Sequence, residues 1–174
     1  MGKIGAILAD TAGVGLRNIN KLVAGIPAER FGRLAAPGGQ TIMSNHPAFA
    51  LGHLCLYPVK VHQLLGQETA AVEPPAGYEK LFSKDASCHD DAAGTLYPAS
   101  SEIVSFFNSS YQAAVETLRG ASDEQLTAVN PLDTPMKQIC PTLGSLLNFY
   151  MSGHVTLHLG QISAWRRMEG LPPA

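Results

Sequence analysis

The residues of this chain best suited to chemistry are two histidines near its C-terminal end, His154 and His158, in the stretch YMSGHVTLHLGQISAWRR. Side chains four residues apart on a helix lie one above the other, so both imidazoles could reach one metal ion. Apolar residues recur around them every three or four positions, which predicts a helix with one face turned into the protein. The residues expected on this inward face are Leu143, Leu147, Tyr150, His154, Leu157, Gln161 and Trp165. The pair therefore predicts part of a metal site, and the alternative is two ordinary core or surface histidines.

A third metal ligand has to come from another inward face, and His53 is the best candidate. It follows Ala50 and precedes Tyr57 at helical spacing in NHPAFALGHLCLY. Three neutral imidazoles leave coordination positions free, as in catalytic zinc sites, whereas structural zinc sites are closed by four protein ligands. Tyr57 and Gln161 share the two inward faces and are expected either to orient a ligand or substrate, or to pack in the core. His46 is expected to line the mouth of the pocket or, more simply, to begin the helix.

Other catalytic patterns are absent or incomplete. Val155 follows His154 at the position where zinc proteases need a glutamate as general base. The sequence contains no GxSxG elbow and no glycine-rich phosphate loop. Cys88–Asp91 offers ligand types without a metal-binding spacing, and His62 lies off its helical stripe and is expected in solvent. The three histidines therefore carry the strongest chemical signal.

The composition is that of one ordinary globular domain covering residues 1–174. Hydrophobic residues make up 45% and charged residues 15% of the chain, and the net charge is -2 with Lys and Arg scattered. A chain without a basic patch is not expected to bind nucleic acid. No apolar run approaches the length of a membrane span, so no membrane association is expected. The odd number of cysteines, Cys55, Cys88 and Cys140, predicts reduced thiols and a cytoplasmic protein.

Four long amphipathic segments are expected to position the histidines. They cover about residues 4–25, 46–66, 100–119 and 141–170, with short helices near 78–82 and 122–126. Pro58 predicts a kink in the second segment just after His53. The long connection over residues 67–98 is expected to be a crossover or to carry function. The pattern predicts an all-α fold, a four-helix bundle with long crossover connections.

Two stretches resemble the DinB-like superfamily of metal-binding four-helix bundles. NHPAFALGHL, followed far downstream by GHVTLHLGQISAWRR, is similar to the family pattern of one histidine from the second helix and an HxxxH pair from the last. Position by position, the family's ligands fall on His53, His154 and His158, and its frequent Gly-Gln-Ile run falls on 160–162. YEKLFSK and YPASSEIVSFF resemble the middle of the family, so the resemblance covers about residues 4–171.

The resemblance implies an up-down-down-up bundle, a divalent metal ion such as zinc or nickel, a small-molecule substrate and a homodimer. Characterised relatives include S-transferases and isomerases that use bacillithiol, mycothiol or similar low-molecular-weight thiols. A thiol-dependent transferase is therefore the expected activity, with a non-catalytic metal-binding or dimerising stress-related bundle and a metal-dependent hydrolase as alternatives, since a fold does not fix a function. The sequence names no catalytic residue, thiol or electrophile, and imidazole ligands suit several metals. Pro58 departs from the family pattern and leaves the geometry beyond His53 open.

Overall fold

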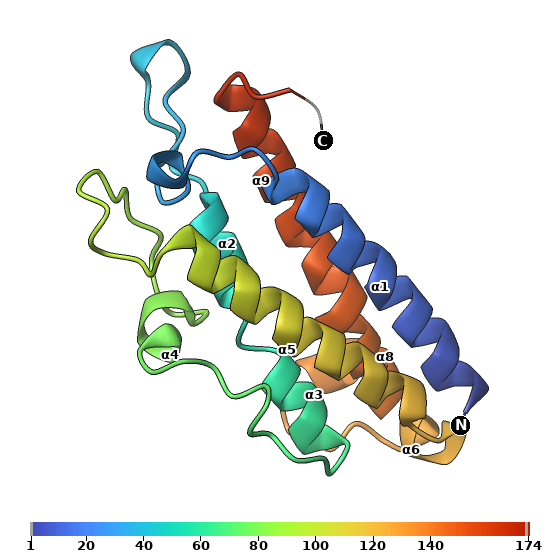
Figure 1. Cartoon of the computed structure of the whole chain (residues 1–174). Helices are drawn as coiled ribbons and strands as arrows, with labels where there is room; N and C mark the ends of the chain where they lie inside the picture. Colours follow the sequence, from blue (N-terminus) through green and yellow to red (C-terminus); the bar gives the residue numbers. More distant parts are fainter. Residues whose placement is uncertain (1, 173) are drawn as a thin grey trace.

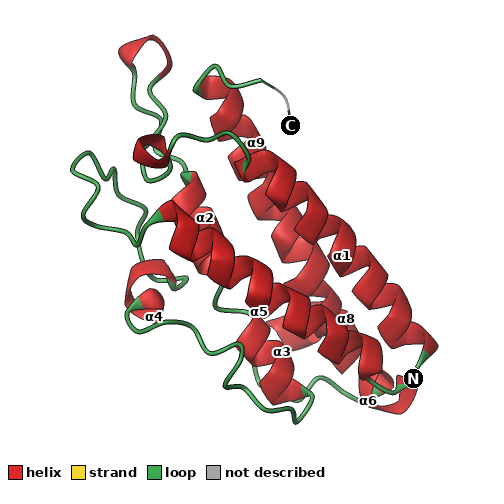
Figure 2. Ribbon diagram, viewed as in Figure 1, coloured by secondary structure: helices red, strands yellow, loops and turns green. Residues whose placement is uncertain are grey.

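Helices make up the regular structure of this protein (Figure 1). The computed structural model describes residues 2–172 and 174, and over these residues it contains helices, turns and loops without a β-strand (Figure 2). The elements are α1 (Lys3–Val23), η1 (Ala28–Arg30), η2 (Pro37–Gly39), α2 (Pro47–Leu54), α3 (Pro58–Leu64), α4 (Tyr78–Phe82), α5 (Ser100–Gly120), α6 (Asp123–Thr127), α7 (Met136–Ile139), α8 (Leu143–Asn148), η3 (Phe149–Gly153) and α9 (His154–Met168). The prediction of an all-α fold is confirmed. Among the described helices, none combines the length and the apolar character needed to cross a bilayer.

The long helices pack side by side around a common core. α1 lies against α5 and α9, and α2 lies against both α5 and α9 (Figure 1). The core contains the fully buried rings of Trp165, Tyr111, Phe82 and Phe107. Because α2 and α9 are neighbours, a side chain near the end of α2 can meet side chains at the start of α9.

The second helical segment is divided in two at Pro58. α2 begins with His46 as its N-cap and Pro47 at the first helical position, where the missing N–H of proline costs no hydrogen bond. Pro58 cannot donate to the carbonyl of Leu54, which instead accepts from the backbone N–H of Tyr57 at 3.1 Å. The sequence predicted a kink just after His53, and the structure instead has a full interruption between α2 and α3.

The last helical segment contains a π-helical turn that the sequence pattern did not predict. In η3 the wider turn leads the N–H of His154 to donate to the carbonyl of Phe149, five residues back. Because this turn holds one additional residue, the inward-facing positions after it are shifted by about one residue toward the C-terminus. His158 is consequently 7% exposed, whereas Leu157 is 62% exposed. The prediction that Leu157 faces inward was wrong for this reason.

The connection between α3 and α5 packs into the core through α4. Tyr78 and Phe82 of α4 are buried, and α4 lies against α2. A Cβ atom added to Gly52 would lie 2.5 to 2.6 Å from the ring of Phe82, so glycine at this position allows the close approach. The connection therefore reaches α2 directly beside His53.

His62 was expected in solvent, and the structure places it in the interior. It is 7% exposed. Its Nδ1 lies 2.7 Å from the carbonyl oxygen of Glu68 and its Nε2 3.1 Å from Oγ1 of Thr117 on α5. The prediction for His62 was wrong because the chain is interrupted at Pro58. After the interruption, α3 packs on α5 with a different set of residues from the one that the stripe of α2 predicts. Both ring nitrogens have partners, so His62 is a structural residue.

Candidate metal centre

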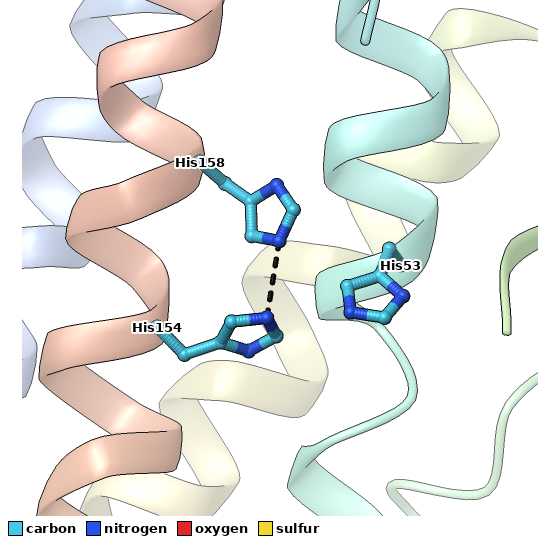
Figure 3. Close-up of side chains that lie close together, drawn as sticks. All are labelled: His53, His154 and His158. Atoms are coloured by element: carbon cyan, nitrogen blue, oxygen red, sulfur yellow. Dashed lines mark hydrogen bonds between the residues drawn. The ribbon is translucent and has the colours of Figure 1, made fainter. Parts of the chain in front are cut away.

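Three buried histidines from two helices converge on one point (Figure 3). His53 belongs to the last turn of α2, and His154 and His158 to the first two turns of α9. The ring centroids lie 5.0 Å apart for His53 and His154, 5.1 Å for His53 and His158, and 4.7 Å for His154 and His158. One nitrogen from each ring lies within 4.8 Å of the other two. The structure thus brings together the three histidines named from the sequence, and together they could hold a metal ion.

The ring of His53 is oriented by a backbone carbonyl of α4. Its Nδ1 lies 2.6 Å from the carbonyl oxygen of Phe82. A carbonyl only accepts, so Nδ1 carries the proton and the neutral ring has its lone pair on Nε2. That Nε2 lies 3.3 Å from the hydroxyl of Tyr57. Burial raises the pKa of Tyr57 to about 12, so the hydroxyl remains protonated and donates to Nε2.

The ring of His158 is oriented in the same way by a side-chain amide. Its Nδ1 lies 2.8 Å from Oε1 of Gln161, one turn further along α9. The same oxygen accepts from Nδ2 of Asn45 at 3.1 Å, which fixes the amide between the loop before α2 and α9. Because Oε1 only accepts, Nδ1 of His158 donates and the lone pair lies on Nε2.

His154 is the ring whose hydrogen bonding is incomplete. Its Nε2 lies 3.1 Å from Nε2 of His158, and its buried Nδ1 has no partner among the described residues. The ring also stacks on Phe149, with centroids 5.6 Å apart. If Nδ1 carries the proton, two Nε2 lone pairs face each other, and if Nε2 carries it, the lone pair on Nδ1 is left alone. Either tautomer leaves a buried nitrogen unsatisfied, which is costly in a protein interior.

The electrostatics of the cluster favour neutral imidazoles. Burial lowers the pKa of His154 to about 3, and the neighbouring charges of His158, His53 and Lys60 act in the same direction. Burial and the charge of His53 lower the pKa of His158 to about 4. Burial also lowers the pKa of His53, against the raising effect of its hydrogen bond to Phe82. All three rings are therefore neutral near pH 7, which is the form that binds metals.

The donor set fits a divalent metal ion with free coordination positions. In a tetrahedral zinc site with Zn–N bonds of about 2.0–2.1 Å, the ligand nitrogens lie about 3.3 Å apart. The 3.1 Å between the Nε2 atoms of His154 and His158 is close to this separation. Phe82 and Gln161 supply the outer acceptors that ligating histidines usually have. The three histidines are 7 to 9% exposed, so the cluster lies in the protein interior.

The three other residues singled out from the sequence have different positions. Tyr57 and Gln161 both hydrogen-bond a histidine of the cluster. His46 is fully buried as the N-cap of α2: its Nδ1 accepts from the N–H of Phe49 at 3.2 Å and its Nε2 lies 3.0 Å from the carbonyl oxygen of His89. Of the two roles expected for His46, the structure shows the helix-initiating one, and both ring nitrogens are hydrogen-bonded in that position.

The acidic pair that follows Cys88 braces a loop. The carboxylate of Asp91 accepts backbone N–H bonds from residues 95–97, and Asp90 bonds the guanidinium of Arg33 and the N–H of Leu34. Both carboxylate oxygens of Asp91 and Oδ1 of Asp90 therefore accept from donors of the protein.

Two contributors to the centre were not predicted, Phe82 and Asn45. Phe82 acts through its backbone carbonyl. Every residue has such a carbonyl, so the residue type does not show which one meets His53. Asn45 stands directly before the helix cap and acts through its side-chain amide, which donates to Oε1 of Gln161. Predicting the role of Phe82 would have required knowing that the loop containing α4 packs against α2.

A scan of protein-family models and a search of curated proteins give no match to this chain.

Proposed function

We propose that this chain binds one divalent metal ion, zinc or nickel, through His53, His154 and His158 and uses it for catalysis. The observation that carries the proposal is the convergence of three neutral, buried imidazoles. Two of them donate from Nδ1 to fixed acceptors and therefore have an unprotonated Nε2. Removing a histidine pair from water without a ligand is unfavourable, and a cation that accepts the facing lone pairs of His154 and His158 relieves the cost. The three ligands leave positions free for a substrate.

The proposal includes membership of the DinB-like superfamily. Its four-helix core would consist of α1, of α2 with α3, of α5, and of α8 to α9, with the segment containing α4 as the long crossover. Support comes from the packing of α1 and α2 on both α5 and α9 and from the two histidine contexts at the matching places in the chain.

The proposed reaction is transfer to or from a low-molecular-weight thiol. A divalent ion in this centre supplies Lewis acidity and lowers the pKa of the thiol or water that it binds. Phe82 and Gln161 hold two of the imidazoles in the ligating tautomer, and the buried aromatic surroundings limit access of water. Cys55 and Cys88 are poor nucleophiles, because burial raises the pKa of Cys55 far above its usual range and that of Cys88 to about 11. Cys140 is buried and out of reach of a substrate. The nucleophilic sulfur is therefore assigned to the substrate.

A non-catalytic metal-binding protein is the second candidate. The burial of the three histidines favours it, because little of their surface is open to an incoming ligand. The two candidates differ in whether an exogenous thiol can reach the metal.

The first experiment is metal stoichiometry. Elemental analysis and competitive zinc titration of the purified protein should give one ion per chain, lost in His53→Ala, His154→Ala and His158→Ala. The exposed His89 gives a matched control, and His89→Ala should bind zinc as the wild type does. If the wild type takes up no stoichiometric metal, or if the triad variants bind it equally well, the metal site is refuted.

The second experiment separates the two candidates. The metal-loaded protein is offered a panel of low-molecular-weight thiols with a chromogenic electrophile, and turnover is expected with at least one thiol. Turnover that persists in His53→Ala would exclude this mechanism. A loaded protein whose metal spectrum does not respond to any thiol would support the non-catalytic candidate.

A further inference from the structure

One side of the histidine cluster is covered by Tyr57, in the turn before α3, and the far side of this tyrosine contacts Lys60 near the start of α3. The ring of Tyr57 lies 4.4 Å from that of His154 and 5.3 Å from that of His53, centroid to centroid. The ammonium nitrogen of Lys60 lies 4.8 Å from the centroid of the Tyr57 ring. Tyr57 thus lies in contact with both the histidines and the lysine, which brings a phenol and a cation next to the proposed metal.

The hydroxyl of Tyr57 now donates to the nitrogen of His53 that metal binding would require. Its oxygen lies 3.3 Å from Nε2 of His53, whose lone pair is free because Nδ1 donates to Phe82. A metal ion taking that lone pair displaces the hydroxyl from its acceptor. The released O–H then needs a new acceptor on the same side of the cluster, and a negatively charged atom is the strongest one available.

The charge balance around the cluster points to the same kind of ligand. The three ligands are neutral and the cluster contains no carboxylate, so a divalent ion keeps its full double charge in a buried place. Lys60 adds a further positive charge, and it takes part in none of the ion pairs found among the described residues. Burial is the largest cause of the lowered pKa of His53 and of His154, and the charge of Lys60 lowers both further. Glu79 on α4, which is exposed to solvent, opposes it at His53 and also raises the pKa of Tyr57. One exposed carboxylate does not offset the combined charge of Lys60 and a divalent ion, so the local excess stays positive.

We propose that Lys60 and the hydroxyl of Tyr57 form an anion subsite beside the metal centre, and that the ligand completing the metal's coordination carries a negative charge beyond the atom bound to the metal. This inference rests on the proposed function and narrows it from thiols in general to acidic thiols, such as thiols bearing a carboxylate. Tyr57 donates a hydrogen bond to the bound anion, and Lys60 supplies the charge that selects it.

The test uses the full-length protein loaded with cobalt(II), whose visible spectrum reports changes of coordination without any turnover. Three small thiols of similar size but different charge are titrated anaerobically: mercaptoacetate, mercaptoethanol and cysteamine. Wild type should bind mercaptoacetate most tightly and cysteamine most weakly. Lys60→Met should reduce the preference for mercaptoacetate over mercaptoethanol roughly tenfold, and Lys60→Arg should keep it. Comparing this ratio between variants cancels the intrinsic differences between the thiols.

Two further variants exclude a merely structural effect. Lys3→Met removes the same charge from an exposed lysine at the start of α1 and should leave the ratio unchanged. Tyr57→Phe should weaken mercaptoacetate binding while cobalt affinity stays equal or increases, because the competing hydroxyl is gone. A parallel loss of cobalt and of mercaptoacetate binding in Tyr57→Phe would contradict the subsite.

The outcomes separate the two proposals. A protein that takes up no cobalt refutes the metal centre, and the subsite with it. A protein that takes up one cobalt ion but binds the three thiols without regard to charge, or keeps the preference in Lys60→Met, refutes the anion subsite alone.

Discussion

The Nδ1 atom of His53 lies 2.6 Å from the carbonyl oxygen of Phe82, so a residue of α4 determines which nitrogen of an α2 histidine is free. The ring of Phe82 packs over Gly52, the residue immediately before His53. Packing and hydrogen bonding therefore act on the same pair of neighbouring residues. The long connection between α3 and α5 has a specific consequence for the site, because it holds the acceptor in place.

Gly52→Ala should disturb both the core and the site. The new Cβ would lie within 2.6 Å of the Phe82 ring, which has no exposed surface through which to move away. We expect a loss of about 1–3 kcal/mol in the free energy of unfolding, as for other overpacked cores, together with weaker zinc binding. Denaturant unfolding and competitive zinc titration measure the two effects.

The matched control for this substitution is Gly160→Ala. Gly160 is an exposed glycine of α9, and a Cβ there meets nothing within 4 Å. Alanine should stabilise the helix by up to about 1 kcal/mol without changing zinc affinity. A Gly52→Ala protein as stable as the wild type would show that α4 is not held against α2 as described.

Replacing Gln161 should affect the metal more than the fold. Gln161→Leu removes the acceptor of the Nδ1 proton of His158, so the ring loses its fixed tautomer and orientation. We expect zinc affinity to fall roughly 10- to 100-fold, the usual cost of losing such an outer contact. Gln161→Glu retains an acceptor oxygen and should retain most of the affinity. Equal zinc affinity in Gln161→Leu and wild type would remove Gln161 from the site.

The sequence predicted the three histidines and most helix positions because these depend on local patterns. The i, i+4 spacing of His154 and His158 and the break at Pro58 follow from helix geometry alone. Beyond η3, His154 and Trp165 face inward as predicted, and Leu157 alone was wrongly assigned to that face. The π-helical turn shifts the phase of the stripe and has no marker among the residue types of 149–153. That single extra residue explains why Leu157 is exposed and His158 is inward.

The remaining features depend on tertiary contacts that a single sequence does not contain. The carbonyl of Phe82 serves His53 only because α4 packs against α2. His62 is buried only because α3 meets α5 after the break. Lys60 gains its place beside the cluster through the ring of Tyr57, from which it lies 4.8 Å away. In each case the spacing along the chain predicts the helix to which the residue belongs, but it does not predict which residue from another part of the chain it contacts.

Acid should destabilise the metal-free protein through the histidine cluster. In the unfolded chain these histidines bind protons near their ordinary pKa of 6.5, whereas burial lowers the folded pKa to about 4 for His158 and about 3 for His154. Between about pH 6.5 and pH 4 the unfolded state therefore binds more protons, and the free energy of unfolding falls as the pH falls. Each such histidine contributes a slope of about 1.4 kcal/mol per pH unit in that window.

Denaturant titrations in the presence of a chelator, at several pH values from neutral to about 5, measure this slope. His158→Gln should show a shallower dependence, because one of the groups that gain a proton on unfolding is removed. His89→Gln removes an exposed histidine and should leave the slope as it is. Superimposable slopes for wild type and His158→Gln would mean that His158 is protonated equally in both states.

His154→Leu should change the stability of the protein in opposite directions with and without metal. The buried Nδ1 of His154 has no partner among the described residues, and its Nε2 faces another imidazole nitrogen, so the metal-free protein bears an unsatisfied polar ring in its core. Leucine is apolar and can occupy much of the same space, which should leave the metal-free protein equally stable or about 1 kcal/mol more stable. For a protein that binds zinc only in its folded state, zinc at about 100 times its dissociation constant adds about 2.7 kcal/mol to the free energy of unfolding. The variant loses this gain.

Thermal unfolding of the wild type and of His154→Leu, each in chelator and in zinc, gives the four values required. A variant that is less stable than the wild type in chelator would show that His154 contributes to the fold itself, whereas the expected reversal would show that the cluster is maintained for binding at a cost to the stability of the empty protein.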